Sequence, residues 1–308
     1  MTGAAGPAGD ADDERPPADV EIGAGLVRRL LRTQHADLAT LPLRRAGGGW
    51  DNEMWRLGDD LVVRLPRRSL GAAAAEHEQR WVPRLARLLD LELPVPVRTG
   101  RPDTGYPYPW TVVRWVDGVP AWQVPVPART SWAPHLAEAL AALHVAAPTD
   151  APANPYRGGP LADRDAVVRD RVAAAGVERL LPLWEDAVAA PVWAGVPRWI
   201  HGDAHPANLV VRGGRLAGLV DFSDLTAGDP ATDLATAWLT FDAAGRTAFH
   251  ERLDAGGAVD ADTWRRARGW AVAMATMMVT RPPGGPIHAI GSHALAELLE
   301  EARRHQGP

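Results

Sequence analysis

A short polar segment holds the residue types best suited to chemistry: His201-Gly202-Asp203-Ala204-His205-Pro206-Ala207-Asn208, with Asp221 following in Leu219-Val220-Asp221-Phe222. Phosphoryl transfer needs a carboxylate for the proton of the attacking hydroxyl and oxygen ligands for a magnesium ion. Asp203 and Asn208 are five residues apart, the separation of base and metal-binding Asn in a kinase catalytic loop. This spacing predicts Asp203 as the base.

The residues after this loop favour a metal site. Asn208 is expected to open a strand, Gly213-Gly214 to form a tight turn, and Asp221 to end the returning strand. Two adjacent antiparallel strands would bring Asn208 and Asp221 close together. We therefore expect these two side chains to bind one or two Mg²⁺ ions beside Asp203.

A second acidic motif, Gly228-Asp229-Pro230-Ala231-Thr232-Asp233, is expected to begin a helix. Asp229 suits the N-cap, and Asp233 should point inward, where a buried carboxylate needs hydrogen-bond donors. The backbone N–H groups of the catalytic loop are the expected donors. Both residues are therefore predicted to be structural.

The rest of the chain predicts an α+β protein with two lobes. A disordered tail is expected at 1–19, an N-terminal lobe at 20–117, and a larger, mostly helical lobe at 118–308. In the N-terminal lobe, strands are expected at 41–45, 53–57, 60–65, 94–98 and 110–116, and helices at 22–31 and 72–90, with Pro83 ending or kinking the second. In the C-terminal lobe, helices are expected at 132–146, 162–175, 178–190, 231–240, 260–280 and 288–304.

These motifs, in this order over about 40–240, resemble the aminoglycoside phosphotransferase family, whose loop reads His-Gly-Asp-x-x-x-x-Asn. The resemblance implies a protein-kinase-like bilobal fold, use of ATP or GTP with Mg²⁺, and phosphorylation of a hydroxyl on a small-molecule acceptor. It also implies that Asp203 is the catalytic base, that Asn208 and Asp221 are metal ligands, and that His201 orients the loop.

The N-terminal lobe offers candidates for nucleotide binding. Gly47-Gly48-Gly49 occupies the place of the phosphate-covering loop, although a plain hairpin turn explains three glycines equally well. Arg64 stands where the family usually has a phosphate-binding lysine, and Glu78 is its expected partner. The backbone of Val113 to Trp115 is expected to hydrogen-bond a purine edge.

Composition excludes several classes of site. The 308 residues contain no cysteine and no lysine, so disulfides and thiolate chemistry are absent. The net charge is −5, and residues 131–308 carry 16 Arg against 21 Asp and Glu, which is not a nucleic-acid footprint. Neither a membrane span nor a signal peptide is predicted, and a cytoplasmic location is expected. Oligomeric state is not predicted.

Two other functions fit parts of the pattern. His201, Asp203 and His205 alternate as metallohydrolase ligands can, but no second His/Asp cluster follows at comparable spacing. The Arg64 substitution raises the possibility of a nucleotide-binding pseudokinase, although Asp203, Asn208 and Asp221 are all retained.

The acceptor stays open at this point. An antibiotic such as an aminoglycoside or a macrolide is the expected acceptor, and choline, homoserine or a sugar is the alternative, since kinases of these metabolites share the loop. The acidic surplus would suit a polycation, whereas Trp184, Trp193, Trp264 and Trp270 would suit a macrolide.

Overall fold

The computed structural model describes residues 16–257 and 259–305. The chain divides into two compact units: the first comprises the described residues up to Gln79 together with Val95–Trp115, and the second comprises Arg80–Pro94 and Val116 onward. The N-terminal lobe expected from sequence is one continuous segment, 20–117. In the structure, residues 80–94 of that segment belong to the second unit. The backbone of Glu92 pairs with Ala217 and Leu219 of the second unit, at 2.9 and 3.1 Å, which explains the exchange.

A disordered tail was expected at 1–19. Residues 1–15 of it lie outside the described residues, and 16–19 lie within them. Asp19, near its end, is held in the first unit. Its carboxylate accepts a 2.9 Å hydrogen bond from the backbone N of Ser69 and a 2.6 Å bond from the Tyr108 hydroxyl.

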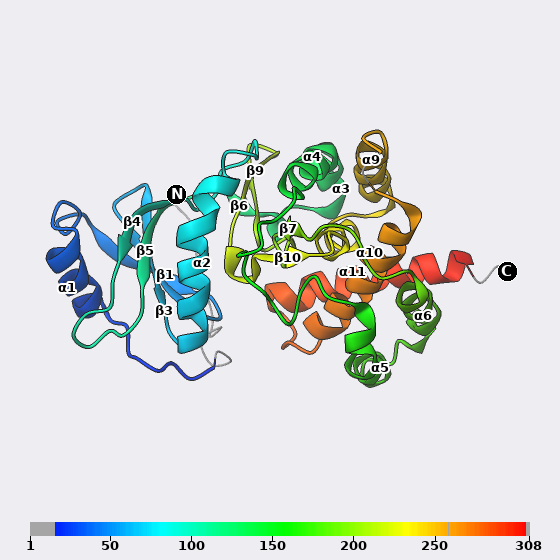
Figure 1. Cartoon of the computed structure of the whole chain (residues 1–308), viewed down its shortest axis with the longest axis horizontal. Coiled ribbons are helices and arrows are strands. Elements are labelled where there is room, and N and C mark those ends of the chain that lie inside the picture. Colours follow the sequence, from blue (N-terminus) through cyan, green and yellow to red (C-terminus); the bar gives the residue numbers. More distant parts are fainter. Residues whose placement is uncertain (1–15, 258, 306–308) are drawn as a thin grey trace, which may run out of the picture. The chain divides into compact units, whose positions relative to one another are not determined.

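The first unit is built on a five-stranded antiparallel sheet, as the sequence predicts, and the strand order is β1-β2-β3-β5-β4. The strands are β1 (Leu43–Gly48), β2 (Asn52–Leu57), β3 (Leu61–Pro66), β4 (Pro96–Gly100) and β5 (Trp110–Arg114), and the helices are α1 (Ala24–Gln34) and α2 (Ser69–Leu85). Figure 1 shows α1 and the first part of α2 on opposite sides of this sheet.

Alternation along β3 explains the two faces. Val63 and Leu65 face the core that α1 covers with Leu30 and Leu31, while Arg64 faces α2. Pro83 lies inside α2, which ends two residues later at Leu85, so the expected end falls close to the proline.

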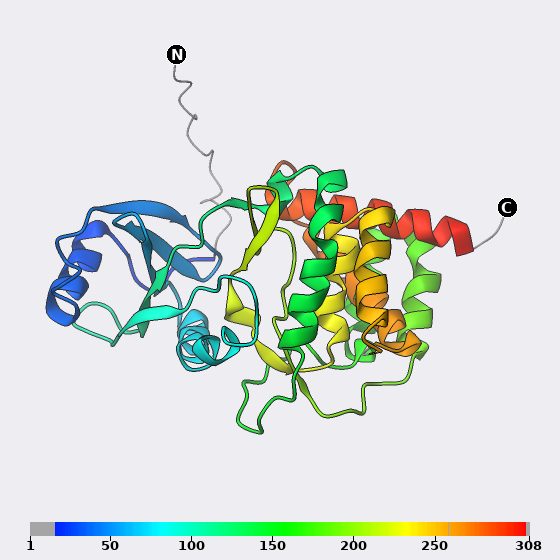
Figure 2. The same ribbon diagram turned by 90° about the horizontal axis from the view of Figure 1, so that it is seen from above.

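The second unit is mostly helical, with short strands beside the helices (Figure 2). Its helices are α3 (Val126–Arg129), α4 (Ala133–Leu143), α5 (Asp165–Ala174), α6 (Leu181–Ala189), α7 (Ala231–Leu234), α8 (Thr236–Thr240), α9 (Ala243–Asp254), α10 (Ala261–Met278) and α11 (Pro286–His305). Its strands are β6 (Val119–Pro120), β7 (Arg198–Ile200), β8 (Leu209–Arg212), β9 (Arg215–Leu219) and β10 (Thr226–Gly228).

The predicted hairpin around Gly213-Gly214 forms as β8 and β9. Both glycines have positive φ, 58° and 75°, which a two-residue turn of this hand requires. The strand ends differ slightly from expectation. Asn208 precedes β8 by one residue, and Asp221 lies two residues beyond β9, so Asp221 does not end the strand.

The sequence missed β6, β7, β10, α3 and α9, all of which the second unit contains. The strands are two or three residues long and α3 has four residues, too short for a periodic pattern. Helix α10 is central, and its Trp270 and Met278 side chains are almost completely buried.

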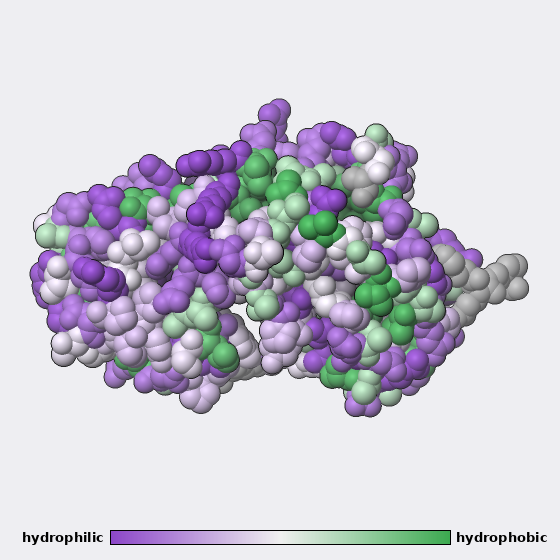
Figure 3. Space-filling model, viewed as in Figure 1, coloured by the Kyte–Doolittle hydropathy of each residue, from purple (hydrophilic) through white to green (hydrophobic). Residues whose placement is uncertain are grey.

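Among the helices of the described residues, none has both the length and the apolar character to cross a bilayer. The face shown in Figure 3 is largely hydrophilic, with hydrophobic residues in scattered groups.

Candidate active site

The loop from His201 to Asn208 leaves β7 and passes close to Asp224. Gly202 has φ of 85°, and a Cβ there would lie 2.5 Å from the backbone O of Asp224. Only glycine fits this conformation and this close approach. Gly202 therefore brings the loop against the segment that follows Asp221.

Asp233 anchors the loop from beneath. Its carboxylate accepts 2.8 Å hydrogen bonds from the backbone N–H groups of His201 and Gly202. This arrangement confirms the expectation that catalytic-loop amides satisfy Asp233. A further 3.1 Å contact to Nε2 of His144 completes the set around a carboxylate that is only 1% exposed.

His201 is fully buried and positions the loop. Its Nε2 lies 3.0 Å from the backbone O of Val220, and its Nδ1 accepts a 3.2 Å hydrogen bond from the backbone N of Asp203. An acceptor at Nδ1 and a carbonyl beside Nε2 assign the neutral Nε2–H tautomer. His201 thus ties the strand before Asp221 to the start of the Asp203 segment.

Asp203 lies among three polar side chains. Its Oδ2 is 3.1 Å from Nε2 of His205 and 3.3 Å from Nδ2 of Asn208, and its Oδ1 is 3.2 Å from Nη2 of Arg157. The Asn208 amide also donates to the Asp203 backbone O at 2.9 Å. These contacts fix the carboxylate while about a quarter of the side chain stays exposed.

The electrostatics keep Asp203 ionised. Burial raises the pKa of Asp203, but His205 and Arg157 outweigh it and hold this pKa well below its ordinary value. Burial lowers the pKa of His205, and the neighbouring Asp203 carboxylate more than compensates, so the pKa of His205 is raised. Asp203 is therefore a carboxylate at neutral pH, as a hydrogen-bond acceptor for an attacking hydroxyl must be.

Sequence reasoning missed Arg157, Asp224 and Asn154. Arg157 donates to the backbone O of Gly202 at 2.6 Å and also pairs with Asp224 at 3.0 Å. The Asn154 amide donates to Oδ1 of Asp224 at 2.8 Å. The available signal was the loop Asn154-Pro-Tyr-Arg157-Gly-Gly, whose turn-forming residues surround one arginine.

Asp221 has an unusual backbone. Its φ is 62°, the one positive value of a non-glycine residue among those the structure describes. A non-glycine residue in this region costs about 1 to 3 kcal/mol and occurs preferentially at functional sites. Its Oδ1 accepts a 2.8 Å hydrogen bond from the Ser223 hydroxyl. The strained turn aims a carboxylate at a position that a continuing strand would not give.

The pair of Asn208 and Asp221 suits a hard cation. The Val220 N–H donates to the Asn208 backbone O at 2.9 Å. Asn208 and Asp221 therefore lie next to each other at the open end of the hairpin. The Asn208 amide nitrogen is committed to Asp203, so its amide oxygen is the atom that could ligate a cation. Within the described residues no group of three or more His, Cys, Asp or Glu side chains is arranged to hold a metal. An ion here would therefore also rely on phosphate or water oxygens, as Mg²⁺ commonly does.

In the first unit, Arg64 pairs with Glu78, the partner expected from sequence. Two hydrogen bonds of 2.7 and 3.1 Å join the guanidinium to the carboxylate, and both residues are 8% exposed. The bidentate contact holds Arg64 on the α2 face of the sheet. Glu76, two residues earlier, is exposed.

The glycine segment forms the end of β1 and the turn into β2. Gly47 has φ of 103° at a bulge opposite β2, which requires glycine. Gly48 ends the strand, and Gly49 donates to the Asn52 backbone O at 2.9 Å. The segment is thus a hairpin turn in shape.

The backbone expected to bind a purine is partly engaged in the sheet. The Trp115 N–H donates to the Asp60 backbone O at 2.7 Å, and Val113 pairs with Val62 in the same register. Antiparallel pairs alternate, so the backbone groups of Arg114 point away from β3. Arg114, which lies inside the expected range, therefore directs its backbone groups to the β4 side of β5.

Asp229 has a structural environment. Its carboxylate forms a buried ion pair with Arg266 of α10 at 2.6 Å and accepts a 3.0 Å hydrogen bond from the Ala231 N–H at the start of α7. The expectation that Asp229 is the N-cap is wrong, because Pro230 holds that position and Asp229 lies one residue before it. Asp229 still accepts a hydrogen bond from the first residue of α7, and it ties that helix to α10.

A family model described as "Phosphotransferase enzyme family" matches residues 42–270, which include the glycine turn, the Arg64–Glu78 pair, the Asp203 loop and Asp221. The chain belongs to this family.

Solved structures share the kinase-like fold of this family member. The GDP and kanamycin complex of APH(2")-IIia superimposes with a TM-score of 0.66 at 21% identity, covering 92% of this chain and 99% of the other. The macrolide 2′-phosphotransferase MphH from Brachybacterium faecium gives 0.60 at 23% identity, covering 88% and 97%. The type I macrolide 2′-phosphotransferase gives 0.59 at 20%, covering 93% and 98%. No curated protein sequence matches this family member.

Proposed function

We propose that this chain transfers the γ-phosphate of ATP or GTP to a hydroxyl of a small molecule, with Mg²⁺ bound at Asn208 and Asp221. One observation carries the proposal. The Asp203 carboxylate is partly exposed and is fixed by Asn208, His205 and Arg157 within a loop that buried groups hold in place, and the neighbouring cations lower its pKa.

Asp203 has the role of accepting the hydrogen bond, and finally the proton, of the acceptor hydroxyl. Because its pKa is low, it orients the hydroxyl early and takes the proton late, which suits a loose phosphoryl-transfer transition state. His201 and Asp233 keep the loop in shape without touching the reacting atoms. When bound, Mg²⁺ would neutralise charge on the phosphates.

In the first unit, Arg64 is the proposed phosphate contact and Glu78 its orienting partner. The buried bidentate pair supports this, because it holds the guanidinium in one geometry. Arginine in place of lysine is therefore read as a working substitution.

Antibiotics are the first acceptors to test, because similar structures include kanamycin, gentamicin and streptomycin complexes and macrolide phosphotransferases. Choline, homoserine and sugars are the second group. A cytoplasmic location belongs to the same proposal, since nucleoside triphosphates are abundant there.

The test is an acceptor screen with purified protein, run in parallel with ATP and GTP and read by the mass gain of one phosphate. Product formation that requires Mg²⁺ and disappears in Asp203→Asn supports the proposal. Nucleotide binding in a thermal-shift assay, without product from any acceptor of either group, would favour a pseudokinase.

A further inference from the structure

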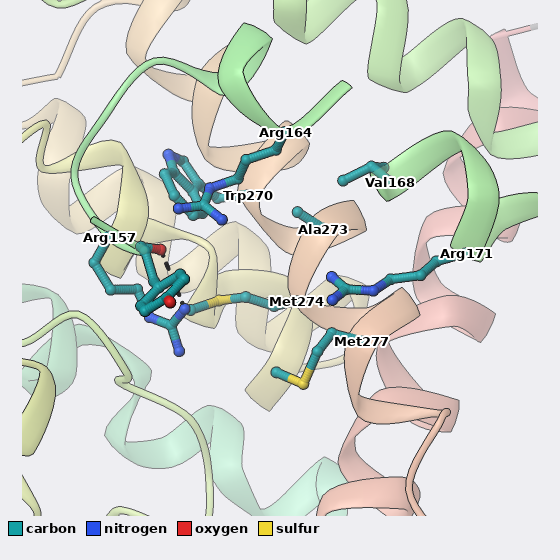
Figure 4. A pocket seen from close by; sticks show the side chains of 9 residues that line it. Arg157, Arg164, Val168, Arg171, Trp270, Ala273, Met274 and Met277 are labelled. Carbon is teal, nitrogen blue, oxygen red and sulfur yellow. Dashed lines mark hydrogen bonds between the residues drawn. The ribbon is translucent and has the colours of Figure 1, made fainter. Parts of the chain in front are cut away.

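A cavity of about 180 Å³ lies within the second unit, between α5, α10 and the loop that carries Arg157. Figure 4 shows the guanidinium groups of Arg157, Arg164 and Arg171 around it, with Trp270, Met274 and Met277 on the α10 side. The wall thus combines three guanidinium groups with the apolar side chains of α10. A cavity of roughly this volume can hold one benzene-sized ring.

The positive charge of this wall is only partly compensated. Arg157 is paired with Asp203 and Asp224. Among the described residues, neither Arg164 nor Arg171 forms an ion pair. Arg164 donates to the Pro155 backbone O at 3.0 Å and stacks 5.0 Å from the Trp270 ring centroid, which fixes its direction without neutralising it.

Burial and neighbouring cations both disfavour the charged forms of Arg164 and Arg171. Burial, followed by repulsion from Arg157 and Arg171, lowers the pKa of Arg164. Burial, followed by repulsion from Arg281, lowers the pKa of Arg171. An anion in the cavity would relieve both repulsions, because each guanidinium would gain an opposite charge.

The cavity is connected to the catalytic carboxylate by one side chain. Arg157 lines the cavity and places Nη2 3.2 Å from Oδ1 of Asp203. Asp203 itself does not line the cavity, so a molecule there would approach the group proposed to activate a hydroxyl past the Arg157 side chain.

We infer that this cavity is the acceptor subsite and selects hydroxylated small molecules that carry an anionic group, a carboxylate or a phosphate, on a flat apolar body. The anion would lie against Arg164 and Arg171, the apolar body against Trp270 and Met274, and the hydroxyl toward Asp203. The inference rests on the proposed role of Asp203. It disfavours polycations, because like charges at a site cost affinity.

The acidic surplus of residues 131–308 does not contradict this. Asp203 and Asp224, the nearby acids, are already paired with Arg157. The described side chains that line the cavity include three arginines and no carboxylate, although Asp163 acts on Arg164 from the neighbouring segment, so an aminoglycoside there would meet mainly cations.

The experiment uses three matched probes of suitable size: 4-(hydroxymethyl)benzoate, its neutral primary amide, and the cationic 4-(hydroxymethyl)benzylamine. Their dissociation constants are measured by calorimetry on the full chain without nucleotide, so that binding is read independently of turnover. We expect the acid to bind about tenfold more tightly than the amide, as charge-assisted hydrogen bonds allow, and the amine not to bind. The corresponding phosphonate shows whether the carboxylate or the phosphate-like group is preferred.

The location is read from methionine methyl signals. Met274 and Met277 line the cavity, whereas Met54 lies in β2 and serves as an internal control. The acid should shift the first two signals and leave the Met54 signal in place. Arg171→Gln should abolish most of the preference for the acid. The matched control is Arg169→Gln on the same helix, whose guanidinium pairs with Asp165 and Glu185 away from the cavity.

Equal or tighter binding of the amide or the amine overturns the inference, as does absence of acid binding or an equal loss in both variants. These outcomes are separable from failure of the proposed function. Acid binding without Mg²⁺- and nucleotide-dependent product would contradict the reaction while leaving the anionic subsite in place. Phosphorylation of the amine in preference to the acid would contradict the anionic subsite while leaving the proposed reaction in place.

Discussion

Oδ2 of Asp233 accepts a 2.8 Å hydrogen bond from the backbone N–H of His201, across 32 positions of the chain. This contact fixes the start of the catalytic loop to α7. The loop thereby owes its shape to a carboxylate that touches none of the proposed reactants.

Asp233→Ala should therefore lower both stability and turnover. Two buried N–H groups would lose their acceptor, at a cost of about 3 kcal/mol in the free energy of unfolding. Denaturant unfolding and kcat check this. Asp242→Ala is the control, because it removes the N-cap of α9 and should cost about 1 kcal/mol with kcat preserved. A kcat unchanged in Asp233→Ala would show that the loop holds its shape without the anchor.

Asp203→Asn should keep the fold and reduce kcat by at least about 100-fold, because the hydrogen-bond acceptor for the hydroxyl loses its basicity. The nucleotide dissociation constant should change little, and circular dichroism should match the native protein. Near-normal kcat in a pure sample of this variant would contradict the assignment of the base.

Asn208→Ala and Asp221→Ala should each move the Mg²⁺ dependence of turnover to higher concentration, because each removes an oxygen ligand. The measurement is a metal titration at saturating nucleotide. Ser223→Ala is a graded control: it removes a hydrogen bond to Asp221 but no ligand, so its shift should be smaller. Titration curves that coincide with the native one would exclude both residues as ligands.

Arg64→Ala should destabilise the protein by about 3 to 5 kcal/mol, because it breaks a buried bidentate ion pair with Glu78. The KM for nucleotide should also rise. Arg64→Lys keeps the charge and should retain more of both properties. If the alanine variant and the native protein unfold with the same denaturant midpoint, the ion pair does not contribute the stability assigned to it.

His250 should make stability depend on pH. Burial lowers the pKa of His250 to about 4, its ring stacks on Trp264 at 3.6 Å, and its Nε2 has no hydrogen-bond partner among the described residues. The unfolded state takes up a proton near pH 6.5 and the folded state only near 4. Stability is therefore complete above about pH 6.5 and falls as the pH drops toward 4, by up to about 3 kcal/mol.

His250→Phe keeps an aromatic ring against Trp264 and removes the titration. The free energy of unfolding, measured from pH 7 to 4, should fall less steeply in this variant than in the native protein. Two parallel curves would mean that the folded state protonates His250 as readily as the unfolded state does.

The sequence alone determined the local features of this protein. Three such features depend only on neighbouring residues, and the structure contains all of them. They are the hairpin around Gly213-Gly214, the alternation that puts Val63 and Arg64 on opposite faces of the sheet, and the spacing that lets Asn208 contact Asp203. The partners of Asp233 were also predictable, because a buried carboxylate must find donors and the nearby loop had backbone N–H groups to offer.

Only the tertiary structure decided the contacts that join distant segments. Arg157 lies 46 positions from Asp203, and no periodic pattern relates the two. The left-handed turn at Asp221 and the engagement of the Trp115 N–H with Asp60 also follow from packing and register. The cavity of arginines collects side chains from a loop, α5 and α10, and its charge opposes that of the chain as a whole. Net charge sums over the surface, whereas a ligand meets only the few groups that the fold brings together.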